Sequence, residues 1–158
     1  MRAYHFLRID MISGQGTEPP WTVGETRTLA GDVVLCQRGY HSSPSPLAAL
    51  EYAPGPILCE VDVSDPDEQD GTKQVSRQRT LVSARDVTQI LHEFALRVAE
   101  DVLPLFEALY PADERPRRAI EVKRRWIQGL ATEEELATAG AAARAAVKAA
   151  GTAASAAA

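Results

Sequence analysis

Cysteine is scarce in this chain, and its scarcity excludes two classes of protein. The 158 residues contain two cysteines, Cys36 and Cys59, which are too few for a small secreted scaffold held by disulfides. They form no C-x-x-C pair and have no further ligands at metal-site spacing, so we expect no metal. We expect two buried thiols in a reducing compartment, with a disulfide between neighbouring strands as the alternative.

Long apolar runs are also missing. No segment approaches about 18 consecutive apolar residues, because Arg144, Lys148 and Gly151 interrupt the alanine-rich end. The first ten residues, MRAYHFLRID, do not read as a signal peptide. We therefore expect a cytoplasmic protein that does not associate with membranes.

Positive charge is in deficit. The chain has 17 Lys and Arg against 22 Asp and Glu, which gives a net charge of -5. Broad nucleic-acid binding needs a basic face, so this balance argues against it and suits a protein that docks on a basic partner. Aromatic residues make up only 6% of the chain, which predicts an aliphatic core.

The sequence pattern changes near residue 85. Before it, short apolar runs divided by Gly and Pro predict strands at 4–9, 33–36, 57–63 and 73–82. Residues 13–31 are rich in turn formers and predict a long loop with a brief strand, in which Trp21 either plugs the core or closes a lid over a pocket. An acidic group predicts a solvated turn, or else a site for a hard cation: Asp65, Asp67, Glu68 and Asp70.

After residue 85 the apolar residues follow a helical period. Asp86 is expected to cap the first helix, and Pro104 to kink or break it. Asp113 is placed to cap a second helix, and Thr132 with Glu135 forms a capping box for a third. The apolar residues that recur on one face of the first helix are Ile90, Leu91, Phe94, Val98, Val102, Leu105, Phe106 and Leu109.

These patterns together predict an α+β protein. We expect a small mixed β-sheet over residues 1–85, a three-helix segment over 86–150 and a frayed alanine-rich tail over 151–158. The second helix is basic, and its cations form either a solvated face or a contact surface for an acidic partner. They are Arg117, Arg118, Lys123, Arg124 and Arg125.

Four short stretches of the N-terminal half occur in an order that resembles the ADP-ribosyltransferase fold in its poly(ADP-ribose) polymerase-like form. They are Tyr4-His5-Phe6, Gly39-Tyr40-His41-Ser42, Ala48 to Tyr52 and Leu58-Cys59-Glu60-Val61. The resemblance implies a pocket for NAD or ADP-ribose, with His5 in the place of a ribose-binding histidine. It also puts His41 in the place of a tyrosine that stacks on nicotinamide. The candidate pocket residues are His5, Tyr40, His41 and Ser43.

The chain departs from this family at the catalytic position. The family's glutamate stabilises the oxocarbenium-like centre, whereas the equivalent stretch here, residues 71–75, reads GTKQV and contains no acid. We therefore expect a protein that is not an ADP-ribosyltransferase enzyme and needs no cofactor. The two histidines either perform acid–base chemistry near neutral pH or serve as structural residues.

Two further resemblances cover the two halves of the chain. The N-terminal half resembles an uncharacterised domain of phage and bacterial genomes, through Leu35, Cys36, Gly39, His41, Pro46, Leu47, Glu60 and Val61. From about Ala95 to Ala146 the chain resembles an immunity-protein-like helical family, with matching stretches at 102–107, 110–111, 115–121, 129 and 132–136. Both resemblances imply genes exchanged in conflicts among phage, bacteria and competing elements.

Three functions follow from these expectations and stay open at this point. The first is a non-catalytic protein that binds a target, either neutralising a toxin or inhibiting a defence complex such as a CRISPR effector. The second is an NAD or ADP-ribose sensor or an ADP-ribosyltransferase-like enzyme. The third is a structural accessory protein of a phage assembly.

Overall fold

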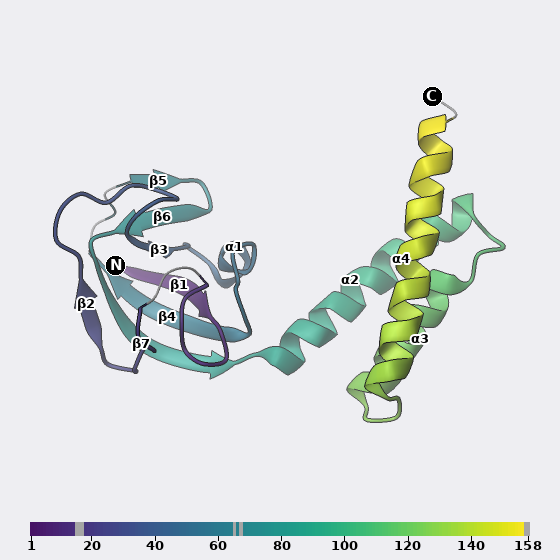
Figure 1. Ribbon diagram of the computed structural model, residues 1–158, viewed down its shortest axis with the longest axis horizontal. Helices are drawn as coiled ribbons and strands as arrows, with labels where there is room; N and C mark the ends of the chain where they lie inside the picture. The colour runs from purple at the N-terminus through teal and green to yellow at the C-terminus, as the bar shows by residue number, and fades with distance from the viewer. Residues whose placement is uncertain (15–17, 65, 67, 157–158) are drawn as a thin grey trace. The chain divides into compact units, whose positions relative to one another are not determined.

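A computed structural model describes residues 1–14, 18–64, 66 and 68–156. The chain forms two compact units, Met1–Thr88 and Gln89–Ala158. The N-terminal unit contains β1 (Arg2–Leu7), β2 (Thr26–Thr28), β3 (Tyr40–Ser42), α1 (Pro46–Leu50), β4 (Ile57–Val63), β5 (Glu68–Asp70), β6 (Lys73–Ser76) and β7 (Gln78–Asp86). The helices that follow are α2 (Thr88–Leu109), α3 (Arg115–Ile127) and α4 (Glu133–Ala156), as Figure 1 shows.

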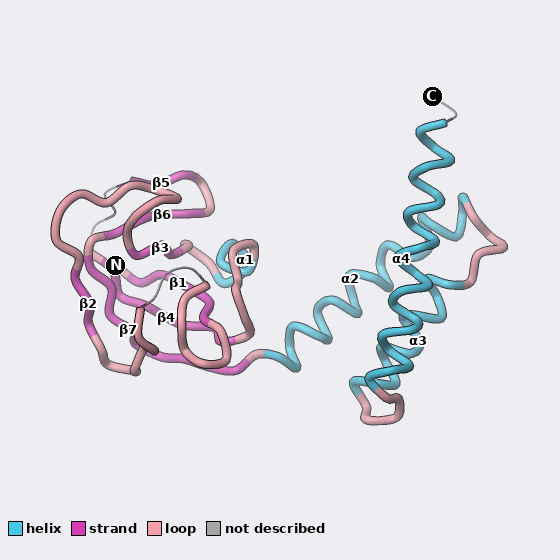
Figure 2. The backbone as a smooth tube through the Cα atoms, in the orientation of Figure 1, coloured by secondary structure: helices cyan, strands magenta, loops and turns pink. Residues whose placement is uncertain are grey.

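The strands of the N-terminal unit form two small sheets (Figure 2). One has the order β1-β4-β7-β2 and the other the order β3-β6-β5. Every strand pair in the described residues is antiparallel, so the α+β class is confirmed but the expected mixed sheet is wrong. Tyr4 and Ser43 connect the two sheets, because each backbone N–H donates to the other residue's carbonyl at 2.8 Å.

The core of this unit follows the alternation of β4. Ile57, Cys59, Val61 and Val63 face inward, as a period of two requires of a strand with one buried face. They pack with Ala3, Leu7, Leu81 and Trp21. Trp21 is only 3% exposed, so its expected role as a core plug is confirmed.

The strand expected at residues 33–36 is wrong. These residues form a turn, with one isolated bridge between Val34 and Arg38 and a left-handed backbone at Cys36 (φ 65°). The Cys36 N–H donates to the His41 ring instead of to a neighbouring strand. Cys36 is exposed and Cys59 buried, so the expectation of two buried thiols holds for Cys59 alone.

Two further expectations for this unit need correction. The run 73–82 is divided at Arg77 into β6 and β7, which belong to different sheets, because the chain turns a corner there. Glu68–Asp70 pairs with β6 as a strand, whereas Asp65 and Asp67 of the expected acidic turn lie outside the described residues.

The predicted helix starts are confirmed. Asp86 accepts a hydrogen bond from the Thr88 N–H at 2.8 Å, and Asp113 accepts one from the Arg115 N–H at 3.2 Å. The Glu135 carboxylate accepts from the Thr132 N–H at 2.7 Å and the Thr132 hydroxyl accepts from the Glu135 N–H at 3.1 Å, as a capping box requires.

Pro104 does not break α2, which is one helix from Thr88 to Leu109. Proline removes one backbone donor, and the Leu, Glu and Ala residues around it favour helix. α4 continues to Ala156, and the last two residues of the tail expected to fray lie outside the described residues.

The apolar face predicted for α2 is largely exposed. Six of its eight apolar residues are exposed: Ile90 58%, Phe94 46%, Val98 46%, Val102 52%, Leu105 71% and Leu109 74%. They recur every three or four residues and so lie along one side of the helix. We call these six residues the α2 stripe.

We predict that Leu81→Ala lowers the free energy of unfolding of the N-terminal unit by about 2–5 kcal/mol, because it leaves a cavity at a residue that is 1% exposed. Leu47→Ala is the control, since Leu47 is 68% exposed and its truncation should change stability by less than about 0.5 kcal/mol. Urea denaturation followed by Trp21 fluorescence in a Trp126→Phe background measures both. Equal losses in the two variants would contradict the assignment of the core.

Candidate functional site

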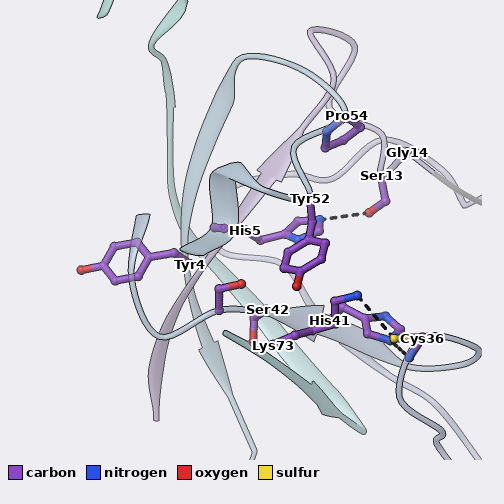
Figure 3. Close-up of a pocket in the computed structure, with 12 residues that line it drawn as sticks. Tyr4, His5, Ser13, Gly14, Cys36, His41, Ser42, Tyr52, Pro54 and Lys73 are labelled. Atoms are coloured by element: carbon purple, nitrogen blue, oxygen red, sulfur yellow. Dashed lines mark hydrogen bonds between the residues drawn. The ribbon is translucent and has the colours of Figure 1, made fainter. Parts of the chain in front are cut away.

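A pocket of about 500 Å³ lies in the N-terminal unit between β1, β3, α1 and the loops beside them (Figure 3). Its polar lining residues are His5, Ser13, Cys36, His41, Ser42, Ser43, Tyr52 and Lys73. No Asp or Glu is among the residues that line it in the described part of the chain. The pocket can therefore offer hydrogen-bond donors and positive charge, but no carboxylate.

Three of the four predicted pocket residues, His5, His41 and Ser43, line this pocket. Tyr40 does not. Its ring packs edge-on against Trp21, with the ring centroids 5.6 Å apart, because alternation along β3 turns it to the opposite face from His41.

His41 holds a tight loop in place. Its Nε2 accepts a hydrogen bond from the Cys36 N–H at 2.8 Å. Burial, followed by the nearby Lys73 charge, lowers the pKa of His41, while a hydrogen bond to the Gly39 backbone raises it by less. Gly39 has a φ of 140°, and a Cβ there would lie 2.2 Å from Val75, so the turn requires glycine. These contacts favour the structural role for His41 over acid–base chemistry.

His5 lies deeper in the same pocket, as Figure 3 shows. Its Nε2 is 3.5 Å from the Ser13 hydroxyl. Burial lowers the pKa of His5 well below its usual range, and the positive charges of Arg79 and His41 lower it further. His5 is therefore neutral at pH 7 and contributes a ring nitrogen, not a charge.

Arg79, on β7, is the functional residue that sequence reasoning missed. It is 3% exposed and donates to the His41 carbonyl at 3.1 Å and to the Ser13 hydroxyl at 3.4 Å. Burial lowers the pKa of Arg79 to about 10, so it stays charged at pH 7. The alternation of the strand could have indicated Arg79, because a strand with Leu81 facing inward also turns Arg79 inward.

Lys73, at the start of β6, brings a second positive charge to the pocket. Its Nζ lies 3.9 Å from the centre of the Tyr52 ring and 3.4 Å from the Cys36 sulfur. Neither Tyr52 nor Cys36 has a carboxylate that could neutralise the ammonium group of Lys73. In the described chain, no acidic side chain lies within ion-pair distance of Lys73 or of Arg79.

The predicted basic surface on α3 is largely engaged within the helical unit. Arg117 pairs with Glu107 and Arg124 pairs with Glu100, at 2.6 and 2.5 Å. Lys123 lies 4.0 Å from the centre of the Trp126 ring. Arg125 donates to the Leu130 carbonyl, and Arg118 lies beside Arg115 at a surface hollow.

The helical unit also contains an apolar cleft of about 350 Å³ between α2, α3 and α4. Leu103 and Phe106 of α2, Ile120 of α3 and Leu136 and Val147 of α4 are among its lining residues. Within the described part of this unit, Ala146 is the one fully buried hydrophobic residue. The three helices therefore leave much of their apolar surface uncovered.

The fold and pocket define an α+β protein with a small sheet unit and a helical unit. A family model for a domain of unknown function, DUF7666, matches residues 1–93, which is more than half of the chain. The chain therefore belongs to the DUF7666 family.

A second family model, Imm-5 like putative immunity protein, matches residues 83–158. The C-terminal half is thus similar to an immunity-type domain, as the sequence resemblance implied. Neither description refers to ADP-ribosyltransferases, phage or CRISPR inhibitors, so these finer expectations gain no support. No curated protein and no solved structure matches the chain. No helix in the described residues is both long and apolar enough to span a bilayer.

We predict that one thiol per native chain reacts quickly with Ellman's reagent, and two do so in denaturant. Cys36 is exposed, whereas Cys59 is buried and burial raises its thiol pKa to about 11, which keeps it from forming the reactive thiolate. Cys36→Ser should remove the fast reaction. Fast reaction of both thiols in the native chain would contradict the structure.

We predict that the N-terminal unit is less stable at pH 5.5 than at pH 7.5. His5 and His41 have lowered pKa values when folded, so below about 6.5 the unfolded chain binds more protons and unfolding is favoured. Urea titrations of the Trp126→Phe variant at both pH values measure the difference through Trp21, and His5→Gln should reduce it. Equal or greater stability at pH 5.5 would contradict this assignment.

Proposed function

We propose that the chain is an immunity-type protein that binds and neutralises a protein target, with the α2 stripe as its docking surface. The observation that carries this proposal is the exposure of six apolar side chains along one face of a single helix. The similarity of residues 83–158 to an immunity protein supports the same kind of role.

The α2 stripe has the dimensions of a helix-docking surface. It extends from Ile90 to Leu109, which at about 1.5 Å per residue is roughly 30 Å of helix. Water-exposed apolar patches of this extent mark interaction sites in soluble proteins. A partner that fully covers a Leu or Phe side chain contributes about 1.5–3 kcal/mol for each.

The packing of the helical unit supports a binding role in a second way. α2 is apolar on two sides, since Leu103 and Phe106 border the cleft while the α2 stripe is exposed, with Val102 at the boundary of the two. A helix with apolar residues on most of its circumference is normally buried. An apolar helix or strand of the target would therefore complete a core that this unit leaves open.

Charges at the edge of the α2 stripe indicate how the target is oriented. Arg97 and Asp101 are both exposed and lie next to the stripe, one turn apart. A target segment with one charge of each sign would pair with both, which fixes its direction along α2. The engaged cations of α3 make that helix a weaker candidate for the primary contact.

We predict that Leu105→Asp weakens binding of the target about 30-fold or more, because it places a charge at the centre of a desolvated apolar contact. Leu47→Asp is a matched control, since Leu47 and Leu105 are 68% and 71% exposed but lie in different units. Proteins captured by the immobilised full chain are identified, purified and titrated singly against wild type and both variants by calorimetry.

Growth of cells that express the captured target tests the immunity role. Expression of the captured target alone should arrest cells, and co-expression of wild type or of Leu47→Asp should restore growth, whereas Leu105→Asp should not. A target that binds all three proteins equally would place the contact elsewhere. A target that causes no arrest would refute the immunity role.

A further inference from the structure

We propose that the pocket of the N-terminal unit binds a small molecule through a phosphate group, with Lys73 as the charged contact and the pocket hydroxyls as donors. The proposal goes beyond target neutralisation, because the pocket belongs to Met1–Thr88 and the docking surface to Gln89–Ala158. Each can therefore fail without the other.

The lining of the pocket selects for an anion. Hydroxyl groups come from Ser13, Ser42, Ser43 and Tyr52, and the lining residues of the described chain include no carboxylate. Gln74 donates to the Ser42 hydroxyl oxygen at 3.1 Å, which leaves the Ser42 proton available for another acceptor. A cationic ligand would find no counter-charge here.

Lys73 supplies a positive charge that the protein does not neutralise. Its Nζ contacts the Tyr52 ring and the Cys36 sulfur, and in the described chain no Asp or Glu lies within 4.0 Å of it. Ammonium groups bind phosphate as point charges, which needs no planar geometry. The ring and the thiol hold the ammonium group at the pocket wall.

Arg79 strengthens the positive potential from behind the wall. Its guanidinium is 3% exposed and donates to the hydroxyl of Ser13, a residue of the pocket lining. Burying a cation is costly; the nearby charge of Glu18 offsets part of that cost, and an anion in the pocket would offset more of it. The lowered pKa values of His5 and His41 agree, since Arg79 contributes to both after burial.

The volume of the pocket indicates a ligand larger than phosphate itself. About 500 Å³ falls within the range of small-molecule sites, and the Tyr52 ring, Pro54 and Ala49 supply apolar contacts for an organic body. The proposed class of ligand is thus a phosphate ester or anhydride of a small organic group. Free pyrophosphate and adenine nucleotides distinguish the contribution of the phosphate from that of the body.

Calorimetric titration of the full chain tests the proposal with four probes: pyrophosphate, ADP-ribose, NAD and adenosine. The three phosphorylated probes should bind, whereas adenosine should not. Lys73→Met should weaken binding about tenfold or more, and Lys73→Arg should retain most of it. Lys148→Met, which removes the same charge from an exposed site on α4, should leave binding unchanged.

Three results would overturn the proposal. One is binding of adenosine as tight as that of ADP-ribose. Another is an equal affinity of Lys73→Met and wild type for the phosphorylated probes. The third is the absence of heat or thermal shift with every probe at several millimolar, for a wild-type chain that melts cooperatively.

Cys36 provides a second readout that needs no change at Lys73. This exposed thiol lines the pocket, so bound pyrophosphate should slow its alkylation by iodoacetamide about fivefold or more. Potassium chloride at equal ionic strength is the control for screening. An unchanged rate would overturn the proposal, and the same protection in Leu105→Asp would show that it is independent of the docking surface.

Discussion

The buried guanidinium of Arg79 is the contact on which the N-terminal unit depends. It extends from β7 of the four-stranded sheet and donates to the His41 carbonyl on β3 of the other sheet. It also lies 4.4 Å from the centre of the Trp21 ring, and Arg27 lies 4.0 Å from the same centre. A cation can be buried here because two of its N–H groups donate hydrogen bonds, the charge of Glu18 favours it and an aromatic face lies against it. The same residue thereby fixes the core plug and one wall of the pocket.

The helical unit differs from the N-terminal unit in the interactions that hold it together. The start of α4 is capped by Thr132 and Glu135, and ion pairs join α2 to α3, but the apolar residues of this unit are mostly uncovered. Local interactions contribute to where the helices begin, and α3 packs closely against α4. Since helices gain most of their stability from packing, a bound partner would stabilise this unit as well as recognise it.

Sequence patterns predicted the features that local interactions determine. The alternation of β4, the capping box of Thr132 and Glu135, and the burial of Trp21 all depend on residues close in sequence or on simple burial. Residues 33–36 have strong strand propensity, yet the ring of His41 takes the Cys36 donor and the run becomes a turn. The helical period of α2 was predicted correctly, but a period cannot show what covers a face. Arg79 was missed because arginine is usually exposed, although its position in β7 turns it inward.

Amide hydrogen exchange of the free full chain, followed by mass spectrometry, tests the central claim that the α2 face is uncovered until a partner binds. We predict that amides of α2 exchange much faster than those of β4 and β7, whose strands hold the core, and that a bound target slows them. Protection of α2 as strong as that of β4 in the free chain would contradict this account.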